Sequence, residues 1–363
     1  MRTRRFLHLA ALLLLLSLLA ACAAPAAPPQ APAGGEEAAP EQPAAEAPAQ
    51  EASQEAGAKT LRIAMLTSGP INDEGWNQTA YEGLLALKEQ GHEIANTENV
   101  AQADQLDLIR SYADQGFDVI IGHGFEYGDA LTTAAEEYPD VKFIQIGGIA
   151  ANDTNLVSYV FKPGEGGYAT GILAGLMTKS NKIGGVGAVE IPTIAADFNA
   201  YGIAARTVNP AIEDVPVAYT GSWVDIPKAK EAAIALIDSG VDVILADGDN
   251  ANVGAIEAAK EAGDVYAMGW TRDQSHLAPD LVLTSVEQRI DNILINAVGA
   301  ILDGTIQWGN HVVGFADGAQ DLAPFNDAVP EDVAAEVNAV VQALVDGKIV
   351  LDDAGNVVKD EYH

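Results

Sequence analysis

The sequence predicts an α/β fold of two similar lobes, each with a parallel β-sheet covered by helices on both faces. From Lys59 onward, short apolar runs rich in β-branched residues alternate with amphipathic helical runs. Such continuous apolar strands are typical of parallel sheets with two buried faces. One phrase also occurs twice, as DQGFDVIIGHG (114–124) and DSGVDVILADG (238–248). The repeat is short, but together with the alternation it favours two related lobes within residues 59–363.

Each expected element follows from its local pattern. The strands are the apolar runs LRIAML (61–66), FDVIIGHG (117–124), VKFIQIGG (141–148), KIGGVGAVE (182–190), VPVAYTGSW (215–223), VDVILADG (241–248) and DVYAMGW (264–270). The helices between them are amphipathic runs that often end on Gly or Ser, including residues 77–91, 104–116, 167–180, 225–240 and 251–263.

The N-terminal 58 residues are expected to lie outside this fold. Residues 1–22 combine an Arg-rich start, a long apolar run and the ending LAAC, which predicts a secretory signal. The ending resembles a bacterial lipobox, so we expect cleavage before Cys22, the only cysteine, and lipidation of its thiol. An ordinary signal peptide or an uncleaved anchor helix is the alternative. Residues 23–58 are rich in Ala, Pro, Glu and Gln, and we expect a disordered stalk there.

The charge balance limits the partners. The chain has 52 acidic and 19 basic side chains, for a net charge of −33. This charge argues against nucleic acid and against electrostatic binding to anionic lipid. We therefore expect contact with the membrane only through the lipid anchor. The histidines show no metal-ligand spacing, and the sequence contains no nucleophile or phosphate-loop motif that would indicate an enzyme.

Candidate site residues follow the predicted strands. In open parallel sheets, ligands bind outside the carboxyl ends of the strands. The corresponding loops carry an aromatic residue, a carboxylate or both, and they are residues 67–77, 122–127, 221–225, 247–252 and 269–274. The combination of indole rings with carboxylates and amides suits a flat ligand with polar edges. The residues that we expect to bind it are Asn72, Asp73, Trp76, Asn77, Phe125, Tyr127, Trp223, Asp249 and Trp270.

Each of these residues also has a structural explanation. Asp73 and Asn77 could simply cap the helix that follows them. Trp76, Trp223 and Trp270 could be core residues. One of the pair Phe125 and Tyr127 is expected to face the core, and the two aspartates of the DGD sequence at 247–249 could be turn residues.

Longer segments carry a family resemblance. NDEGWNQTAYEG, GFEYGDA, DIPKAKEAAIALIDSGVDVI and VPEDVAAEVNAVVQALVDGKIV follow the lipobox and the stalk. Together they resemble the basic membrane protein family of substrate-binding lipoproteins, which serve ABC transporters. The resemblance covers about residues 59–350. It implies a type I periplasmic-binding-protein fold, with two Rossmann-like lobes joined by a hinge of three crossovers.

This fold implies specific lobe boundaries. Lobe 1 would comprise residues 59–162 with a return segment around 289–320. Lobe 2 would comprise residues 163–288 with a C-terminal segment around 321–363.

The resemblance also implies the ligand. Family members bind mostly purine nucleosides, and some bind free bases. By position, Asp73 and Asn77 would contact the edge of the base, and Trp76 and Trp223 would stack on its two faces. The family's ribose-binding Asp and Lys align with Thr271 and Gln288, although the second alignment could shift by one residue to Arg289. Both ribose-binding charges are therefore expected to be lost, and a free base such as adenine is as well supported as a nucleoside.

The predicted function is that of an extracytoplasmic, lipid-anchored, monomeric solute-binding protein that delivers a purine to an ABC transporter permease, without a cofactor or catalysis. Two alternatives remain open at this point. The protein could bind another small solute such as a sugar, or it could be a ligand-sensing receptor for a membrane signalling protein.

Overall fold

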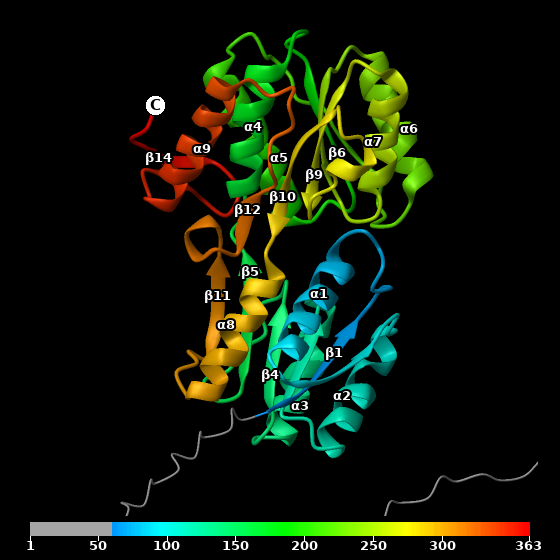
Figure 1. Cartoon of the computed structure of the whole chain (residues 1–363), viewed down its shortest axis with the longest axis vertical. Helices are drawn as coiled ribbons and strands as arrows, with labels where there is room; N and C mark the ends of the chain where they lie inside the picture. The colour runs from blue at the N-terminus through cyan, green and yellow to red at the C-terminus, as the bar shows by residue number, and fades with distance from the viewer. Residues whose placement is uncertain (1–59) are drawn as a thin grey trace, which may run out of the picture. The chain divides into compact units, whose positions relative to one another are not determined.

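The computed structural model describes residues 60–363. The predicted signal peptide, Cys22 and the whole predicted stalk therefore lie outside the described residues. Within residues 60–363, no helix is long and apolar enough to cross a membrane. The described chain forms two six-stranded sheets and a small two-stranded sheet (Figure 1).

The first sheet is entirely parallel. Its strands, in spatial order, are β11 (Gly309–Val313), β5 (Leu156–Phe161), β4 (Lys142–Ile146), β3 (Val119–His123), β1 (Arg62–Thr67) and β2 (Glu93–Thr97). Its helices are α1 (Trp76–Glu89), α2 (Gln105–Asp114), α3 (Gly128–Glu137) and α8 (Ile290–Asp303). Strand β1 shows why the sheet is covered on both faces. Ile63 and Met65 pack into one apolar cluster, and Ala64 and Leu66 pack into another.

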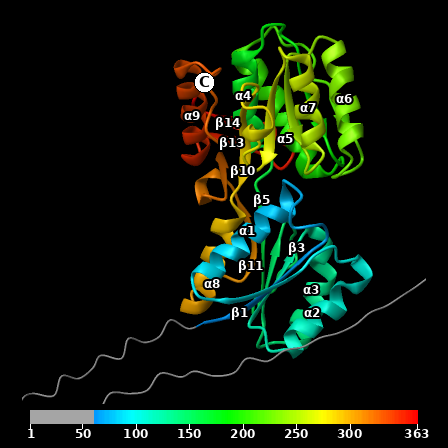
Figure 2. The ribbon, with the colours of Figure 1, turned by 45° about the vertical axis from the view of Figure 1, so that its right-hand side comes forward.

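The second sheet repeats this plan with one antiparallel edge strand. Its strands are β12 (Gln320–Leu322), β10 (Val282–Gln288), β9 (Tyr266–Thr271), β8 (Val243–Asp247), β6 (Ile183–Gly187) and β7 (Val217–Tyr219). Its helices are α4 (Glu165–Met177), α5 (Pro192–Val208), α6 (Ile226–Asp238), α7 (Asn252–Ala262) and α9 (Glu331–Val345). Helix α9 packs on α4 beside the hairpin of β13 (Ile349–Leu351) and β14 (Val357–Asp360) (Figure 2).

The chain passes between the two sheets more than once. It leaves the first sheet after β5, returns after β10 to form α8 and β11, and then enters the second sheet again as β12. Helix α8 lies against α1, where a Cβ atom on Gly83 would be 3.0 Å from the Cα of Asp291 (Figures 1 and 2). The glycine therefore permits the close approach that fixes the returning segment on the first lobe.

Candidate functional site

A cavity of about 390 Å³ lies where loops from both sheets meet. Its walls come from the loops that follow β1, β3 and β4 in the first lobe, and from the segments that follow β6, β7 and β8 together with the end of β9 in the second. Segments near the crossovers after β5 and β10 complete it. The cavity therefore occupies the place that parallel sheets provide for ligands, outside the carboxyl ends of the strands.

The loop after β1 is organised by one carboxylate. Buried Asp73 accepts hydrogen bonds at Oδ1 from the backbone N–H groups of Gly75 (3.1 Å) and Gln78 (3.0 Å). Its Oδ2 accepts from the backbone N–H (3.0 Å) and the side-chain Nδ2 (2.6 Å) of Asn77. These bonds satisfy N–H groups in the first turn of α1. Asp73 and Asn77 both line the cavity, so the same two residues stabilise the start of the helix and form part of the wall.

Trp76 lines the cavity, and its indole packs against other side chains of the first lobe. Its ring stacks on His123, with ring centroids 4.2 Å apart and an interplanar angle of 25°, and the edge of Phe161 lies 6.1 Å away. His123 Nε2 lies 3.0 Å from the carbonyl oxygen of Trp76. Burial lowers the pKa of His123 to about 4, so the ring that supports the indole is neutral at physiological pH. One face of the Trp76 ring is thus packed against His123, and the residue also lines the cavity.

The second lobe contributes two indoles. Trp223, in the loop after β7, lines the cavity and packs partly against the core of its lobe. Trp270, near the end of β9, also reaches the cavity but is almost fully buried. Phe125 lies on the first-lobe wall with 63% of its surface exposed. The structure therefore brings aromatic side chains of both lobes to one cavity.

Two of the candidates from the sequence do not reach the cavity lining. Asn72 is exposed on the loop before α1. Tyr127 is completely buried in the apolar cluster that packs on one face of the first sheet. Phe125 and Tyr127 belong to the same 3₁₀ turn, in which side chains two positions apart point in different directions. This geometry separates an exposed wall residue from a core residue, so one member of the pair is indeed internal.

The two lobes contact each other beside the cavity. Asp249 Oδ1 accepts a hydrogen bond from the backbone N–H of Trp76 (2.7 Å), and the Asn250 side chain donates to the carbonyl oxygen of Asp73 (2.8 Å). The closeness is extreme at Gly75, where a Cβ atom would lie 1.8 Å from Asp249 Oδ1. Burial, and then the nearby charge of Asp73, raise the pKa of Asp249 well above its ordinary value.

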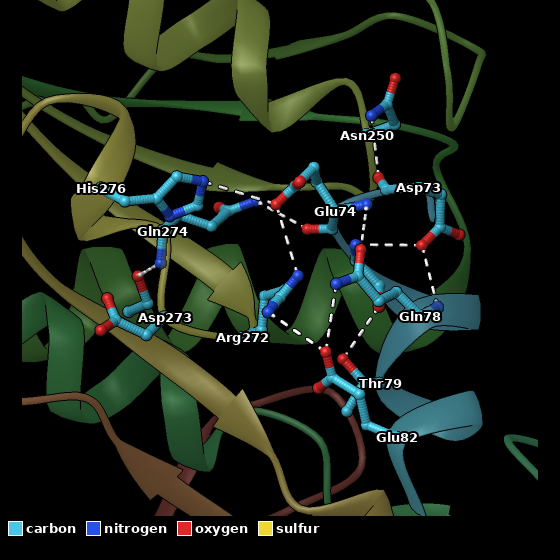
Figure 3. A network of polar contacts seen from close by, with 12 residues as sticks. Asp73, Glu74, Gln78, Thr79, Glu82, Asn250, Arg272, Asp273, Gln274 and His276 are labelled. Carbon is cyan, nitrogen blue, oxygen red and sulfur yellow. Dashed lines mark hydrogen bonds and ion pairs between the residues drawn. The ribbon is translucent and has the colours of Figure 1, made fainter. Parts of the chain in front are cut away.

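A partly exposed polar network continues this contact (Figure 3). The guanidinium of Arg272 lies 3.3 Å from Glu74 and 3.4 Å from Glu82, and Gln274 Nε2 donates to the carbonyl oxygen of Glu74 at 3.4 Å. The structure therefore shows the lobes in a closed arrangement that is held by polar contacts.

The residues at the aligned ribose positions are both in the cavity wall. Thr271 and Gln288 line it. Thr271 has a φ of 79°, which is unusual for a β-branched residue and costs about 1–3 kcal/mol. Lys162 is the cation among the lining side chains, and its Nζ lies 2.7 Å from Glu165 Oε1.

Sequence reasoning missed two buried carboxyls in the wall. Asp197, on α5, and Asp247, the last residue of β8, both line the cavity. Asp247 stands in a sequence, ADGDN, that indicated a turn as readily as a site. Asp197 lies inside a helical run of small residues, where no neighbouring motif marks it.

Two α/β lobes that close over a cavity of aromatic and polar side chains define a solute-binding protein that captures its ligand between the lobes. Comparison with known proteins makes this class specific. The family model for PnrA-like ABC transporter substrate-binding proteins (Bmp) matches residues 60–348. The chain belongs to this family, which confirms the resemblance found in the sequence.

Individual relatives agree with this assignment. The chain is 34% identical over 277 residues to the purine-binding protein BAB2_0673 of Brucella abortus, covering 75% of this chain and 77% of the relative. It is 27% identical over 301 residues to basic membrane protein A of Borreliella burgdorferi, covering 81% and 88%. A solved ABC transporter solute-binding protein from Conexibacter woesei is 26% identical, with a TM-score of 0.69 over 81% of this chain and 99% of that one. The predicted two-lobed fold is thereby confirmed.

Proposed function

We propose that this ABC transporter substrate-binding protein captures a purine, as a free base or a nucleoside, between its lobes. The observation that carries the proposal is that Trp76 of one lobe and Trp223 of the other line the same cavity. Stacking of a base on an aromatic side chain is worth roughly 1–3 kcal/mol, so two rings suit a planar heterocycle. A relative with 34% identity is named as a purine-binding protein.

The capture mechanism follows from the interlobe contacts. A ligand that stacks on the Trp76 ring in the open form would be covered by the second lobe when the lobes close and the backbone N–H of Trp76 bonds to Asp249. Closure excludes water, which strengthens the remaining hydrogen bonds to the ligand. A ligand that contacts both lobes binds the closed form better than the open form and so shifts the population toward it.

The family role supports further parts of the proposal. The protein would act outside the cytoplasm as a monomer, held to the membrane by a lipid on Cys22, and would pass its ligand to a permease without catalysis or a cofactor. Nothing in the cavity requires a chemical step, because its indoles, amides and carboxyls can all bind a ligand through stacking and hydrogen bonds. Mass spectrometry of the mature N-terminus would detect the diacylated Cys22.

The ligand can be tested directly. Small molecules released from the denatured protein would be identified by mass spectrometry, followed by calorimetric titration with adenine, adenosine, hypoxanthine, inosine, guanosine, ribose and glucose. We expect binding of at least one purine, and loss of at least tenfold in affinity in Trp76→Ala and in Trp223→Ala.

A matched control is available for these variants. Trp308→Ala removes an indole that lies outside the cavity lining, and it should leave affinity unchanged. Binding of a sugar with no binding of any purine would refute the purine proposal and favour a sugar-binding role. Release of free base from a bound nucleoside would refute the absence of catalysis.

A further inference from the structure

The cavity contains a carboxyl group whose hydrogen-bonding capacity is unused. Asp247 ends β8, paired in register with Gly187 of β6. Its side chain is 0% exposed and lines the cavity. Neither of its carboxyl oxygens has a hydrogen-bond partner among residues 60–363. A buried polar group without a partner is costly, so this arrangement indicates a group that is completed by a ligand.

A second carboxyl lies near the first. Asp197 is also buried in the wall, and its Oδ1 accepts a hydrogen bond from the backbone N–H of Gly164 at 2.7 Å. Burial raises the pKa of Asp197 to about 8, and the neighbouring charge of Glu165 adds to this shift. Burial, with the charge of Asp197, also raises the pKa of Asp247 well above its ordinary value. No basic side chain offsets the rise in the pKa of either carboxyl.

The loop that starts at Asp247 connects this residue to the two tryptophans. Asp247 begins the loop 247–251, and that loop is bonded to the backbone of both tryptophans. Asp249 accepts from the N–H of Trp76 at 2.7 Å, and Ala251 donates its N–H to the carbonyl oxygen of Trp223 at 2.9 Å. The loop that follows Asp247 is therefore bonded to the residues of both indoles, and we expect a planar ligand stacked between them to reach this part of the wall.

The hydrogen-bonding groups of the wall determine which substituent of the ligand fits against it. An ionised carboxyl only accepts hydrogen bonds, and a protonated one keeps at least one oxygen as an acceptor. Three aspartates, Asp197, Asp247 and Asp249, line the cavity, and in either protonation state each carboxyl has more acceptor sites than donors. An exocyclic amino group offers two N–H donors. A keto oxygen offers none; it can accept the O–H of one protonated carboxyl, but it leaves the other carboxyl oxygens without a donor.

The other end of the cavity has a different character. Gln288 and Gln320 line it and are paired in register on β10 and β12. In the order β12-β10-β9-β8, Asp247 and Gln320 are separated by three strand spacings, about 14 Å. The Oε1 atom of Gln320 also has no partner within the described part of the chain.

We propose that Asp247, with Asp197 beside it, is a specificity subsite that reads the exocyclic amino group of the ligand, so that the protein prefers aminopurines to 6-oxopurines that lack an amino group. This inference rests on the proposed purine function. The two residues are positioned to bind the ligand edge, whereas stacking on the indoles would be insensitive to the substituent.

The test compares matched ligand pairs in the full chain. Calorimetric titration should show adenosine over inosine, or adenine over hypoxanthine, by roughly ten- to hundredfold, because the oxo ligand leaves a buried acceptor without a donor. Asp247→Asn replaces one acceptor with an N–H₂ donor at the same size. It should bring the amino-to-oxo affinity ratio close to one or invert it.

The controls separate the possible outcomes. Asp238→Asn makes the same change at the exposed end of α6 and should leave the ratio unchanged. If thermal melting shows that Asp247→Asn does not fold, Asp197→Asn applies the same test from the neighbouring position. The subsite proposal would be refuted if the unsubstituted protein bound both members of each pair with equal affinity, or if Asp247→Asn left the amino-to-oxo affinity ratio unchanged. The proposed purine binding would not be affected by either result. Absence of binding to every purine would instead overturn the proposed function.

Discussion

Replacement of Gly75 by alanine should prevent the lobes from closing completely. The new Cβ atom would lie 1.8 Å from Asp249 Oδ1, far inside van der Waals contact, and the lobes would have to separate to relieve it. Separation would break the bonds from Trp76 N–H to Asp249 and from Asn250 to the Asp73 carbonyl. Each bond contributes about 0.5–1.5 kcal/mol. Their loss, about 1–3 kcal/mol, predicts a five- to 150-fold weaker affinity.

The assay is calorimetric titration with the ligand that the mass-spectrometric experiment identifies, together with small-angle scattering to follow compaction on binding. Gly299→Ala is the matched control, because a Cβ atom there, in the middle of α8, meets nothing within 4 Å. The double variant Gly75→Ala/Asp249→Ala gives the sharpest comparison. Removal of the carboxylate makes room for the methyl group, so the double variant should bind no more weakly than Asp249→Ala alone. Unchanged affinity in Gly75→Ala would refute the closed geometry.

Three other predictions concern stability and salt. Gly83→Leu should lower the free energy of unfolding by about 1–3 kcal/mol in chemical denaturation, because its Cβ would press on the Asp291 backbone 3.0 Å away; an unchanged transition midpoint would contradict this packing. Asp197 is protonated in the fold up to a pKa of about 8, whereas an unfolded aspartate ionises near 3.8, so rising pH between these values destabilises the ligand-free protein. Between pH 6.5 and 8, above the range where buried His123 ionises, the melting temperature of the unsubstituted protein should therefore fall more steeply with pH than that of Asp197→Asn. The same dependence on pH in both proteins would count against this effect. Arg272→Gln should weaken ligand binding by less than about fivefold, and only at low salt, because its ion pairs are partly exposed; an equal loss at high salt would show a different role.

Local patterns were sufficient to predict most of the fold. The apolar runs at β1, β3 and β8 are buried on both faces of their sheets, so composition alone revealed them as parallel strands. The same reasoning predicted where the candidate site lies, because the loops after these strands must meet at one edge. The family segments then indicated where the chain crosses between the lobes.

Side-chain direction was harder to predict. Phe125 and Tyr127 have similar chemistry and differ by two positions, yet only the turn geometry decides which of them faces the cavity. The same applies to the DGD sequence. Asp249 points across to the other lobe, while Asp247 remains in the wall, and a sequence of alternating Asp and Gly does not distinguish the two. Contacts between lobes depend on tertiary structure, which no local pattern contains.

Trp76 combines two tasks in one residue. Its indole lines the cavity, and its backbone N–H donates a hydrogen bond to the side chain of Asp249 on the opposite lobe. The surface on which a ligand stacks and the contact that holds the lobes together therefore share a single Cα. Ligand binding and lobe closure thus depend on the same residue, and a side-chain substitution there changes the stacking surface while it leaves the backbone N–H that binds Asp249 in place.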